Sequence, residues 1–201
     1  MAQSAKTQRL EFLFDFGSPA SYLAYKRVPA LAARTGAEVD YVPMLLGGVF
    51  KATGNASPAT VPAKGRWMNE DLARNARRYG VPLAINPHFP INTLALMRAI
   101  TGVQLRMPER LQDFLRGVFK AIWIDALNLN DPAFVARALH DAGFDPQQIL
   151  ALSVDADVKA ALLATTDEAV ARGVFGAPTM FVGDTMFFGQ DRLDFVREAL
   201  A

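Results

Sequence analysis

The chain has 201 residues, of which 51% are hydrophobic, and its formal net charge is +1. This length allows one globular unit with one sizeable core. The balanced charge excludes the strongly basic surface that is typical of nucleic-acid-binding proteins, so no nucleic-acid partner is expected. The sequence contains no cysteine, which excludes disulfides, cysteine-ligated zinc and a thiol nucleophile of the chain's own.

Neither a metal site nor a membrane segment is expected. The two histidines, His88 and His140, are far apart in sequence and lack acidic neighbours at ligand spacing. No stretch approaches the ~20 apolar residues that cross a bilayer. Residues 1–9 are polar and do not resemble the apolar core of a signal peptide. We therefore expect a soluble, cytoplasmic protein with no membrane partner and no metal.

The first elements predict a β-α-β unit. Hydrophobic side chains alternate along residues 10–16, which favours a buried strand. Residues 17–19 end this strand, and Ser18 then stands at the N-cap of a helix over 19–35 whose first residue is proline. Residues 38–43 form the next predicted strand. Because the connection is a helical crossover, the two strands should be parallel.

The middle of the chain is predicted to be helical. A long loop rich in glycine and proline follows Met44. After this loop, apolar spacing and Asn, Asp or Pro start signals predict a series of helices over residues 62–79, 92–101, 108–124, 131–142 and 146–152. These helices should pack into a compact lobe.

Strands return near the end of the chain. A helix is predicted over 155–171, a hairpin over 179–182 and 185–188, and a last helix over 190–200. Without the middle helices, the order of elements is that of thioredoxin. We therefore predict an α/β, thioredoxin-like fold with a large all-helical insertion.

This order of elements also implies a division into domains. A discontinuous thioredoxin-like domain is expected over 8–47 and 155–201, and a helical insert domain over 48–154.

Ser18 is the first candidate for chemistry. A helix N-terminus offers free N–H groups and about half a positive charge, which together stabilise an anion. In disulfide oxidoreductases of this fold the same position holds the thiolate of a Cys-x-x-Cys pair, and the spacing persists here as Ser18 and Ser21. The alternative is that Ser18 only caps the helix.

Two segments near the end of the chain carry further candidates, and the first is predicted to face Ser18. Pro178 precedes the third strand, and a cis proline at this place exposes the backbone N–H and C=O of Ala177 to an extended peptide. Asp191 opens the last helix and could receive an ammonium group. The alternatives are an ordinary loop proline and an ordinary acidic residue at a helix start.

Four segments together resemble one family over nearly all of residues 10–200. These are DFGSPASYLA at 15–24, RYGVP at 78–82, VFGAPTMFV at 174–182 and FGQDRL at 188–193. They are similar to 2-hydroxychromene-2-carboxylate isomerases, which are relatives of kappa-class glutathione transferases and of DsbA-type oxidoreductases.

The resemblance implies a glutathione-dependent isomerase of aromatic hydrocarbon catabolism that works as a homodimer. The family's active serine falls on Ser18. Its glutathione contacts fall on Ser18, Ala177, Pro178, Phe188, Gly189, Gln190 and Asp191. Glutathione would supply the sulfur that this chain lacks, while the Ala177 backbone pairs with its cysteinyl unit and Asp191 receives its γ-glutamyl ammonium.

For the second ligand, the resemblance implies a small aromatic carboxylate. Lys51 matches a family lysine that could pair with the carboxylate, although it could equally be a solvated lysine in a loop. Thr60 and Val61 stand where isomerases of the naphthalene pathway carry an Asn-Arg pair. Arginines of the following helix could supply the lost charge, or could form a solvated face: Arg66, Arg74, Arg77 and Arg78.

Three functions remain open at this point. The resemblance implies the interconversion of 2-hydroxychromene-2-carboxylate and trans-o-hydroxybenzylidenepyruvate by reversible addition of a thiolate. A kappa-type transferase or peroxidase would instead consume glutathione. A thioredoxin-fold binding module without catalytic activity is the third possibility. No base accompanies Ser18 in the sequence, which argues against a Ser-His hydrolase.

Overall fold

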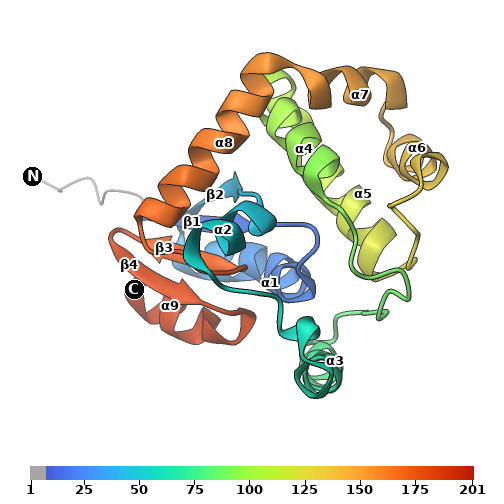
Figure 1. Cartoon of the computed structure of the whole chain (residues 1–201). Helices are drawn as coiled ribbons and strands as arrows, with labels where there is room; N and C mark the ends of the chain where they lie inside the picture. Colours follow the sequence, from blue (N-terminus) through green and yellow to red (C-terminus); the bar gives the residue numbers. More distant parts are fainter. Residues whose placement is uncertain (1–7) are drawn as a thin grey trace, which may run out of the picture.

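A four-stranded mixed sheet forms the centre of the computed structural model, which describes residues 8–201 (Figure 1). The strands are ordered β2-β1-β3-β4. β1 (Arg9–Phe14) pairs in parallel with β2 (Glu38–Pro43) and antiparallel with β3 (Thr179–Val182). β3 also pairs antiparallel with β4 (Thr185–Phe188). The predicted β-α-β unit, hairpin and thioredoxin-like fold are confirmed, although β1 ends at Phe14 and not at residue 16.

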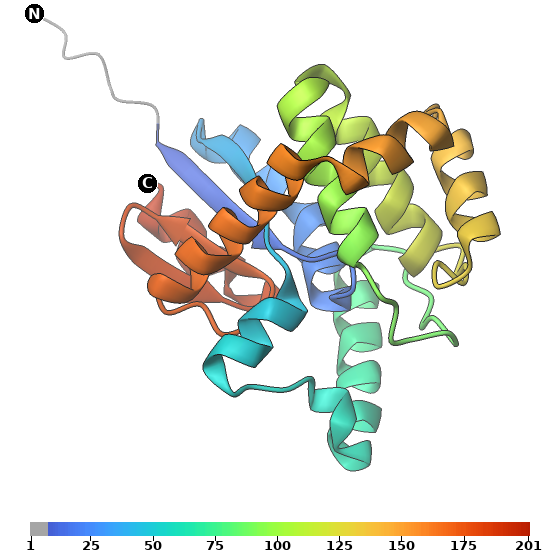
Figure 2. The same cartoon turned by 45° about the horizontal axis from the view of Figure 1, so that its top comes forward.

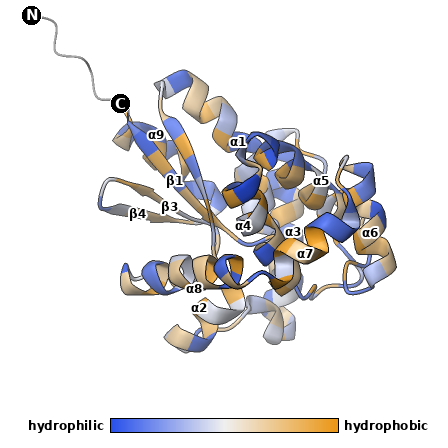
Figure 3. Ribbon diagram, turned by 90° about the horizontal axis from the view of Figure 1, so that it is seen from above, coloured by the Kyte–Doolittle hydropathy of each residue, from blue (hydrophilic) through white to orange (hydrophobic). Residues whose placement is uncertain are grey.

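Helices cover both faces of this sheet. Figure 3 shows α1 (Pro19–Thr35) and α9 (Leu193–Ala199) on one side, and α8 (Ala156–Ala171) with α2 (Leu46–Thr53) on the other. The sheet is therefore the middle layer of three, as expected when a parallel strand pair is joined by a helical crossover.

The side chains of β1 contribute to a separate core on each face. Phe12 and Phe14 belong to a large cluster that also contains the inner sides of α1 and the insert helices. Leu13 points the other way, into a smaller cluster with Phe181. Because successive residues of a strand face opposite sides, the aromatic alternation read in the sequence marks the face toward the larger core.

The insert consists of helices, as predicted. It contains α3 (Pro62–Tyr79), α4 (Leu94–Arg106), α5 (Leu111–Trp123), α6 (Pro132–Asp141) and α7 (Pro146–Val154). Short 3-10 turns lie at η1 (Pro58–Thr60), η2 (Pro108–Arg110) and, after the hairpin, η3 (Gln190–Arg192). Figure 2 shows α3 extending away from the other helices of the insert.

The prediction of a long loop after Met44 was wrong over Leu46–Thr53, which form α2. Gly47 and Gly48 disfavour a helix by up to about 1 kcal/mol each relative to alanine. Tertiary contacts compensate for this cost, because Val49 is fully buried and the backbone N–H of Leu46 donates to the Asp15 carboxylate at 2.9 Å. The proposed domain boundary between residues 47 and 48 falls within this helix, and the division into domains remains a proposal.

The insert and the sheet share contacts beside the end of β1. Trp123 of α5 is 2% exposed, and its indole N–H donates to the Phe16 carbonyl at 2.8 Å. The Phe119 ring lies 4.8 Å from that of Phe16 and 4.9 Å from that of Tyr25, measured between centroids. The connection between β1 and α1 is therefore held from both parts of the chain. Within residues 8–201, no helix has the length and apolar character needed to span a membrane.

Candidate functional site

Ser18 stands at the N-cap of α1, as predicted. Its side-chain oxygen accepts the backbone N–H of Ser21 at 3.1 Å, and its hydroxyl donates to the carbonyl of Ala177 at 2.9 Å. Ser18 is 5% exposed. One hydroxyl thus caps a helix and also bridges residues that are 159 positions apart in sequence. A function limited to capping would not require the second contact.

The loop before β3 carries the contact with Ser18. The Ala177–Pro178 peptide bond is cis. The Pro178 carbonyl accepts the backbone N–H of Gly189 at 3.0 Å, and the Phe175 carbonyl accepts the side-chain amide of Asn55 at 2.8 Å. The loop is thereby tied to the start of η3 on one side and to the residues after α2 on the other.

The last residue of β4 and the segment after it bring the remaining predicted contacts close to this loop. The Phe188 ring is 41% exposed and packs on that of Phe175, with 4.5 Å between centroids. Gly189 has a φ of +102°, a conformation that L residues rarely adopt. The Gln190 carbonyl accepts a hydrogen bond from Arg27 of α1 at 3.1 Å. Asp191 is exposed, and its carboxylate pairs with Arg192 next to it.

Two buried side-chain oxygens near these segments lack a partner. Among the described residues, no hydrogen-bond partner lies within reach of Gln190 Oε1 or Ser21 Oγ. Gln190 is 6% exposed and Ser21 is fully buried. A buried amide oxygen without a donor costs about 1–3 kcal/mol. Gln190 Oε1 is therefore a buried acceptor without a donor among the described residues.

The role of Asp15 was not predicted from the sequence, where it appeared only as the first residue of the segment at 15–24. Asp15 is 2% exposed, and its carboxylate accepts the backbone N–H of Gly17 at 2.8 Å, that of Leu46 at 2.9 Å and the Thr93 hydroxyl at 2.7 Å. Burial raises the pKa of this carboxyl above its ordinary value of 3.8, although the three donors oppose the shift. A carboxylate at the end of a buried strand, three residues before the serine, was the available signal.

Lys51 lies on α2 and not in a loop. It lines a pocket between α2, α4 and α8 that Ser18 does not line. Thr60 and Val61 are exposed at η1 and the start of α3. Of the arginines considered on α3, Arg74 pairs with Glu70 and Asp71 on the exposed helix surface, which fits the solvated alternative for this residue.

Comparisons with known proteins agree with this architecture. The family model of the DsbA-like thioredoxin domain matches residues 9–201. A 2-hydroxychromene-2-carboxylate isomerase of Sphingobium xenophagum is 33% identical over 96% of this chain and 98% of its own length. A kappa 1 glutathione S-transferase of Caenorhabditis elegans is 28% identical over 97% of this chain and 92% of its own length.

A solved structure supports the same assignment. The structure of a 2-hydroxychromene-2-carboxylate isomerase superposes with a TM-score of 0.83 at 29% identity, covering 96% of this chain and 94% of its own. The match to the family model and the full-length identity both extend across the sheet, the insert and the site segments. The chain therefore belongs to the DsbA-like thioredoxin family and, within it, to the enzymes of the 2-hydroxychromene-2-carboxylate isomerase family.

Proposed function

We propose that this enzyme is a glutathione-dependent cis-trans isomerase. It would interconvert 2-hydroxychromene-2-carboxylate and trans-o-hydroxybenzylidenepyruvate, or a related intermediate of aromatic catabolism. The observation that carries the proposal is the Ser18 hydroxyl, which lies at the N-terminus of α1 and 2.9 Å from the carbonyl of Ala177. Among its relatives, those named isomerases and those named glutathione transferases both cover nearly the whole chain.

The residues around Ser18 have the chemistry that a γ-glutamyl tripeptide needs. The Ala177 backbone offers an N–H and a carbonyl for an extended peptide. Asp191 offers an exposed carboxylate, which would exchange its pairing with Arg192 for the ammonium at the γ-glutamyl end. Phe188 gives an exposed aromatic surface beside them.

Glutathione would supply the thiolate that adds reversibly to the conjugated double bond of the substrate, leaving a single bond that can rotate. Ser18 would hold this sulfur in its charged form. Its hydroxyl would turn from the Ala177 carbonyl toward the sulfur, while the Ser21 N–H keeps the side-chain oxygen in place. The same rotation would free the Ala177 carbonyl to accept an N–H from the tripeptide. The free N–H groups of α1 would add to the stabilisation of negative charge.

The contact with the second substrate, the compartment and the oligomeric state are proposed as well. Lys51 would pair with the carboxylate of the aromatic substrate. The protein would work in the cytoplasm as a homodimer, as the family resemblance implies.

A direct test is to incubate the protein with 2-hydroxychromene-2-carboxylate, with and without glutathione, and to follow the absorbance of the open product. We expect turnover only with glutathione, and no loss of glutathione after many turnovers. Net consumption of glutathione would favour the kappa-type transferase instead. The transferase is the second candidate because several relatives are named kappa glutathione S-transferases.

A third outcome would reject both enzymatic candidates. If calorimetry shows no binding of glutathione and no substrate is converted, the binding-module alternative gains support. A Ser18→Ala variant measured beside the wild type separates catalysis by this site from a background reaction in solution.

A further inference from the structure

Arg27 of α1 joins two segments that are far apart in sequence. Its guanidinium donates to the backbone carbonyl of Gln190 at 3.1 Å. The same guanidinium lies over the ring of Tyr79, with 3.9 Å between its central carbon and the ring centroid. Gln190 is the first residue of η3, directly before Asp191, and Tyr79 is the last residue of α3. One side chain of α1 therefore contacts both the segment after β4 and the insert.

Both partners of Arg27 are uncharged. Arg27 is partly buried and has no carboxylate partner within residues 8–201. By contrast, the guanidinium of Arg172 pairs with Glu11 through two hydrogen bonds. A planar guanidinium can stack on an aromatic ring and still direct an N–H from its edge at a carbonyl. The contacts of Arg27 thus fix the positions of a backbone and a ring, and they do not balance its charge.

The η3 turn depends on this contact for its position beside α1. η3 begins without a side-chain cap, and Gly189 before it adopts a φ of +102°. Gly189 is held by the carbonyl of Pro178, at 3.0 Å from its N–H. Within residues 8–201, the hydrogen bond from Arg27 is the only one between η3 and α1. Loss of the Arg27 side chain would therefore leave the Gln190 backbone free to move away from α1.

A movement of the Gln190 backbone would also move Asp191, which follows it directly. The Asp191 carboxylate is exposed, so its direction is set by the backbone of η3 and not by a surrounding pocket. A charge-assisted hydrogen bond weakens when the donor and the acceptor lose their distance or their angle. The strength of any ammonium contact at Asp191 should therefore depend on Arg27.

We propose that Arg27 is a positioning residue for recognition of the γ-glutamyl ammonium of glutathione, and that Tyr79 orients Arg27 for this role. The inference rests on the proposed function, because it concerns how Asp191 meets this ammonium. It adds that the insert helix α3 contributes to the affinity for glutathione through Arg27, without a contact between Tyr79 and the ligand. A direct contact of Arg27 with the γ-glutamyl carboxylate is the competing explanation.

Two analogues of glutathione separate these explanations. 4-Aminobutanoyl-cysteinylglycine keeps the ammonium and lacks the γ-glutamyl carboxylate, whereas glutaryl-cysteinylglycine keeps this carboxylate and lacks the ammonium. Calorimetry should show that Arg27→Met weakens binding of glutathione and of the aminobutanoyl analogue about fivefold, as for a misaligned charge-assisted contact. Binding of the glutaryl analogue should not change. If Arg27 binds the carboxylate directly, the loss appears with the glutaryl analogue and not with the aminobutanoyl analogue.

The role of Tyr79 is tested by a double-mutant cycle. Tyr79→Leu should weaken glutathione binding, and the double variant with Arg27→Met should bind no more weakly than Arg27→Met alone, because Tyr79 acts through Arg27. Tyr79→Phe keeps the ring and removes only the hydroxyl, which donates to Asn75 at 3.1 Å. It should bind glutathione like the wild type. Additive losses in the cycle would overturn the role of Tyr79.

Arg34→Met is the matched control, because Arg34 is an exposed arginine in the last turn of the same helix. It should bind all three peptides like the wild type. Arg27→Lys should recover part of the affinity, since an ammonium can also donate to the Gln190 carbonyl and lie over the Tyr79 ring. If Arg27→Met does not fold, as judged by its melting temperature, Arg27→Lys and Tyr79→Leu provide the same comparison of the three peptides.

The outcomes distinguish this inference from the proposed function. A wild type that does not bind glutathione would overturn both. A wild type that binds glutathione, with an unchanged affinity in Arg27→Met, would overturn the inference alone. A loss that is equal for all three peptides would also overturn it, because the ammonium would then have no part in the effect.

Discussion

At the scale of single residues, the site depends on one hydroxyl with more than one possible hydrogen bond. Ser18 accepts from Ser21 N–H, and this contact belongs to the helix cap; its own proton is donated to Ala177 and can be redirected without breaking the cap. An alanine at position 18 would remove both contacts. Capping and catalysis therefore have to be separated by measurements that respond to only one of them.

Ser18→Ala should raise the pKa of the thiol of bound glutathione and slow turnover. A free thiol titrates near pH ~8.5, and a donor to the charged sulfur lowers this value, so its loss shifts the pKa back upward. The slower turnover should recover in part at higher pH. Loss of the cap should also cost about 1 kcal/mol of stability. Titration of thiolate absorbance, beside a thermal melt, measures both effects.

Ser21→Ala is the matched control, because Ser21 Oγ is buried on the same helix without a partner. This variant should leave the thiol pKa of bound glutathione unchanged, since its backbone N–H still reaches Ser18. If the thiol pKa of bound glutathione is the same in the Ser18→Ala variant and in the wild type, Ser18 acts only as a helix cap.

Asp191→Ala should weaken glutathione binding about tenfold, because the γ-glutamyl ammonium loses a charge-assisted partner at an exposed position. Asp194→Ala provides the comparison, since Asp194 is an exposed acid in the first turn of α9. Calorimetry with glutathione should show the loss only in the first variant. If both variants bind glutathione with the same affinity, Asp191 is only an acidic residue at a helix start and not a ligand contact.

Asp15→Asn should destabilise the fold by about 1–3 kcal/mol, because the amide nitrogen cannot accept one of the three hydrogen bonds. Burial raises the pKa of Asp15 in the folded state above 3.8. Between 3.8 and that higher value the folded state binds more protons than the unfolded chain, so this carboxyl contributes less stability as pH rises.

The difference in unfolding free energy between wild type and Asp15→Asn should therefore be largest at low pH and shrink as pH rises from 3.8 upward. Urea unfolding of both proteins over a pH series measures this difference. A difference that grows with pH would mean that the hydrogen bonds outweigh burial and that the carboxyl is held ionised.

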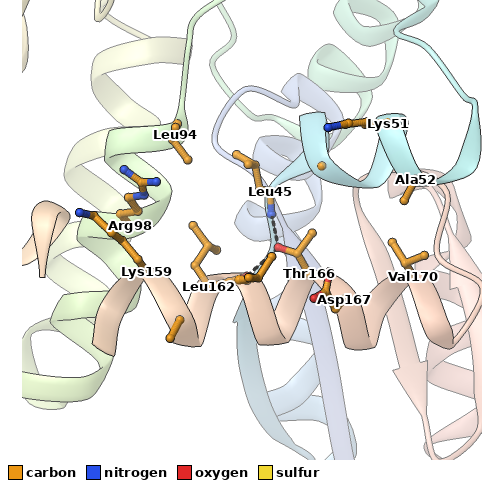
Figure 4. A pocket seen from close by; sticks show the side chains of 13 residues that line it. Leu45, Lys51, Ala52, Leu94, Arg98, Lys159, Leu162, Thr166, Asp167 and Val170 are labelled. Carbon is orange, nitrogen blue, oxygen red and sulfur yellow. Dashed lines mark hydrogen bonds between the residues drawn. The ribbon is translucent and has the colours of Figure 1, made fainter. Parts of the chain in front are cut away.

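At the scale of elements, sequence patterns predicted what is local and missed what depends on distant partners. The strands, α1 and the hairpin follow from alternation, a serine cap and turn residues. The helix α2 was missed because its glycines argue against it, and its supports, Asp15 and the packing of Val49, are tertiary. The pocket between α2, α4 and α8 (Figure 4) could not be predicted, because the residues that line it come from helices far apart in the sequence.

Glycines within helices mark where the helical insert is packed most tightly. On Gly117 of α5, a Cβ would overlap the Cβ of Ala142 at the end of α6, whereas on Gly47 of α2 nothing lies within 4 Å of it. Gly117→Ala should destabilise by about 1–3 kcal/mol, since overpacking exceeds the gain in helix propensity. Gly47→Ala should be neutral or stabilising by up to about 1 kcal/mol. Chemical denaturation compares the two, and a stabilised Gly117 variant would show that α5 and α6 can separate without cost.

At the scale of the whole molecule, the predicted division into a thioredoxin-like part and an insert follows the order of elements along the chain. It does not follow the hydrophobic core, which the two parts share. One buried cluster contains residues of β1 and α1 as well as α4 and α5. Trp123 of α5 donates to Phe16, two residues before Ser18. The geometry of the site thus depends on packing between both parts.

We therefore expect the chain to unfold in one cooperative transition. Trp67 of α3 is 62% exposed and Trp123 is 2% exposed, so a Trp67→Phe variant leaves Trp123 as a single reporter of the insert. Trp123 packs in the same buried cluster as the side chains of β1. We therefore expect the insert and β1 to unfold together.

The measurement is urea unfolding of the Trp67→Phe variant, followed by fluorescence and by far-ultraviolet circular dichroism, with hydrogen exchange of the β1 and α5 amides. The two optical transitions should coincide, and the slowest amides of both elements should exchange with the same free energy. A Trp123 transition at lower urea, with β1 still protected, would instead establish residues 48–154 as an independently unfolding domain. In that case Phe16 would lose its indole donor before the sheet melts, and activity should disappear with the first transition, because the backbone beside Ser18 is held by that contact.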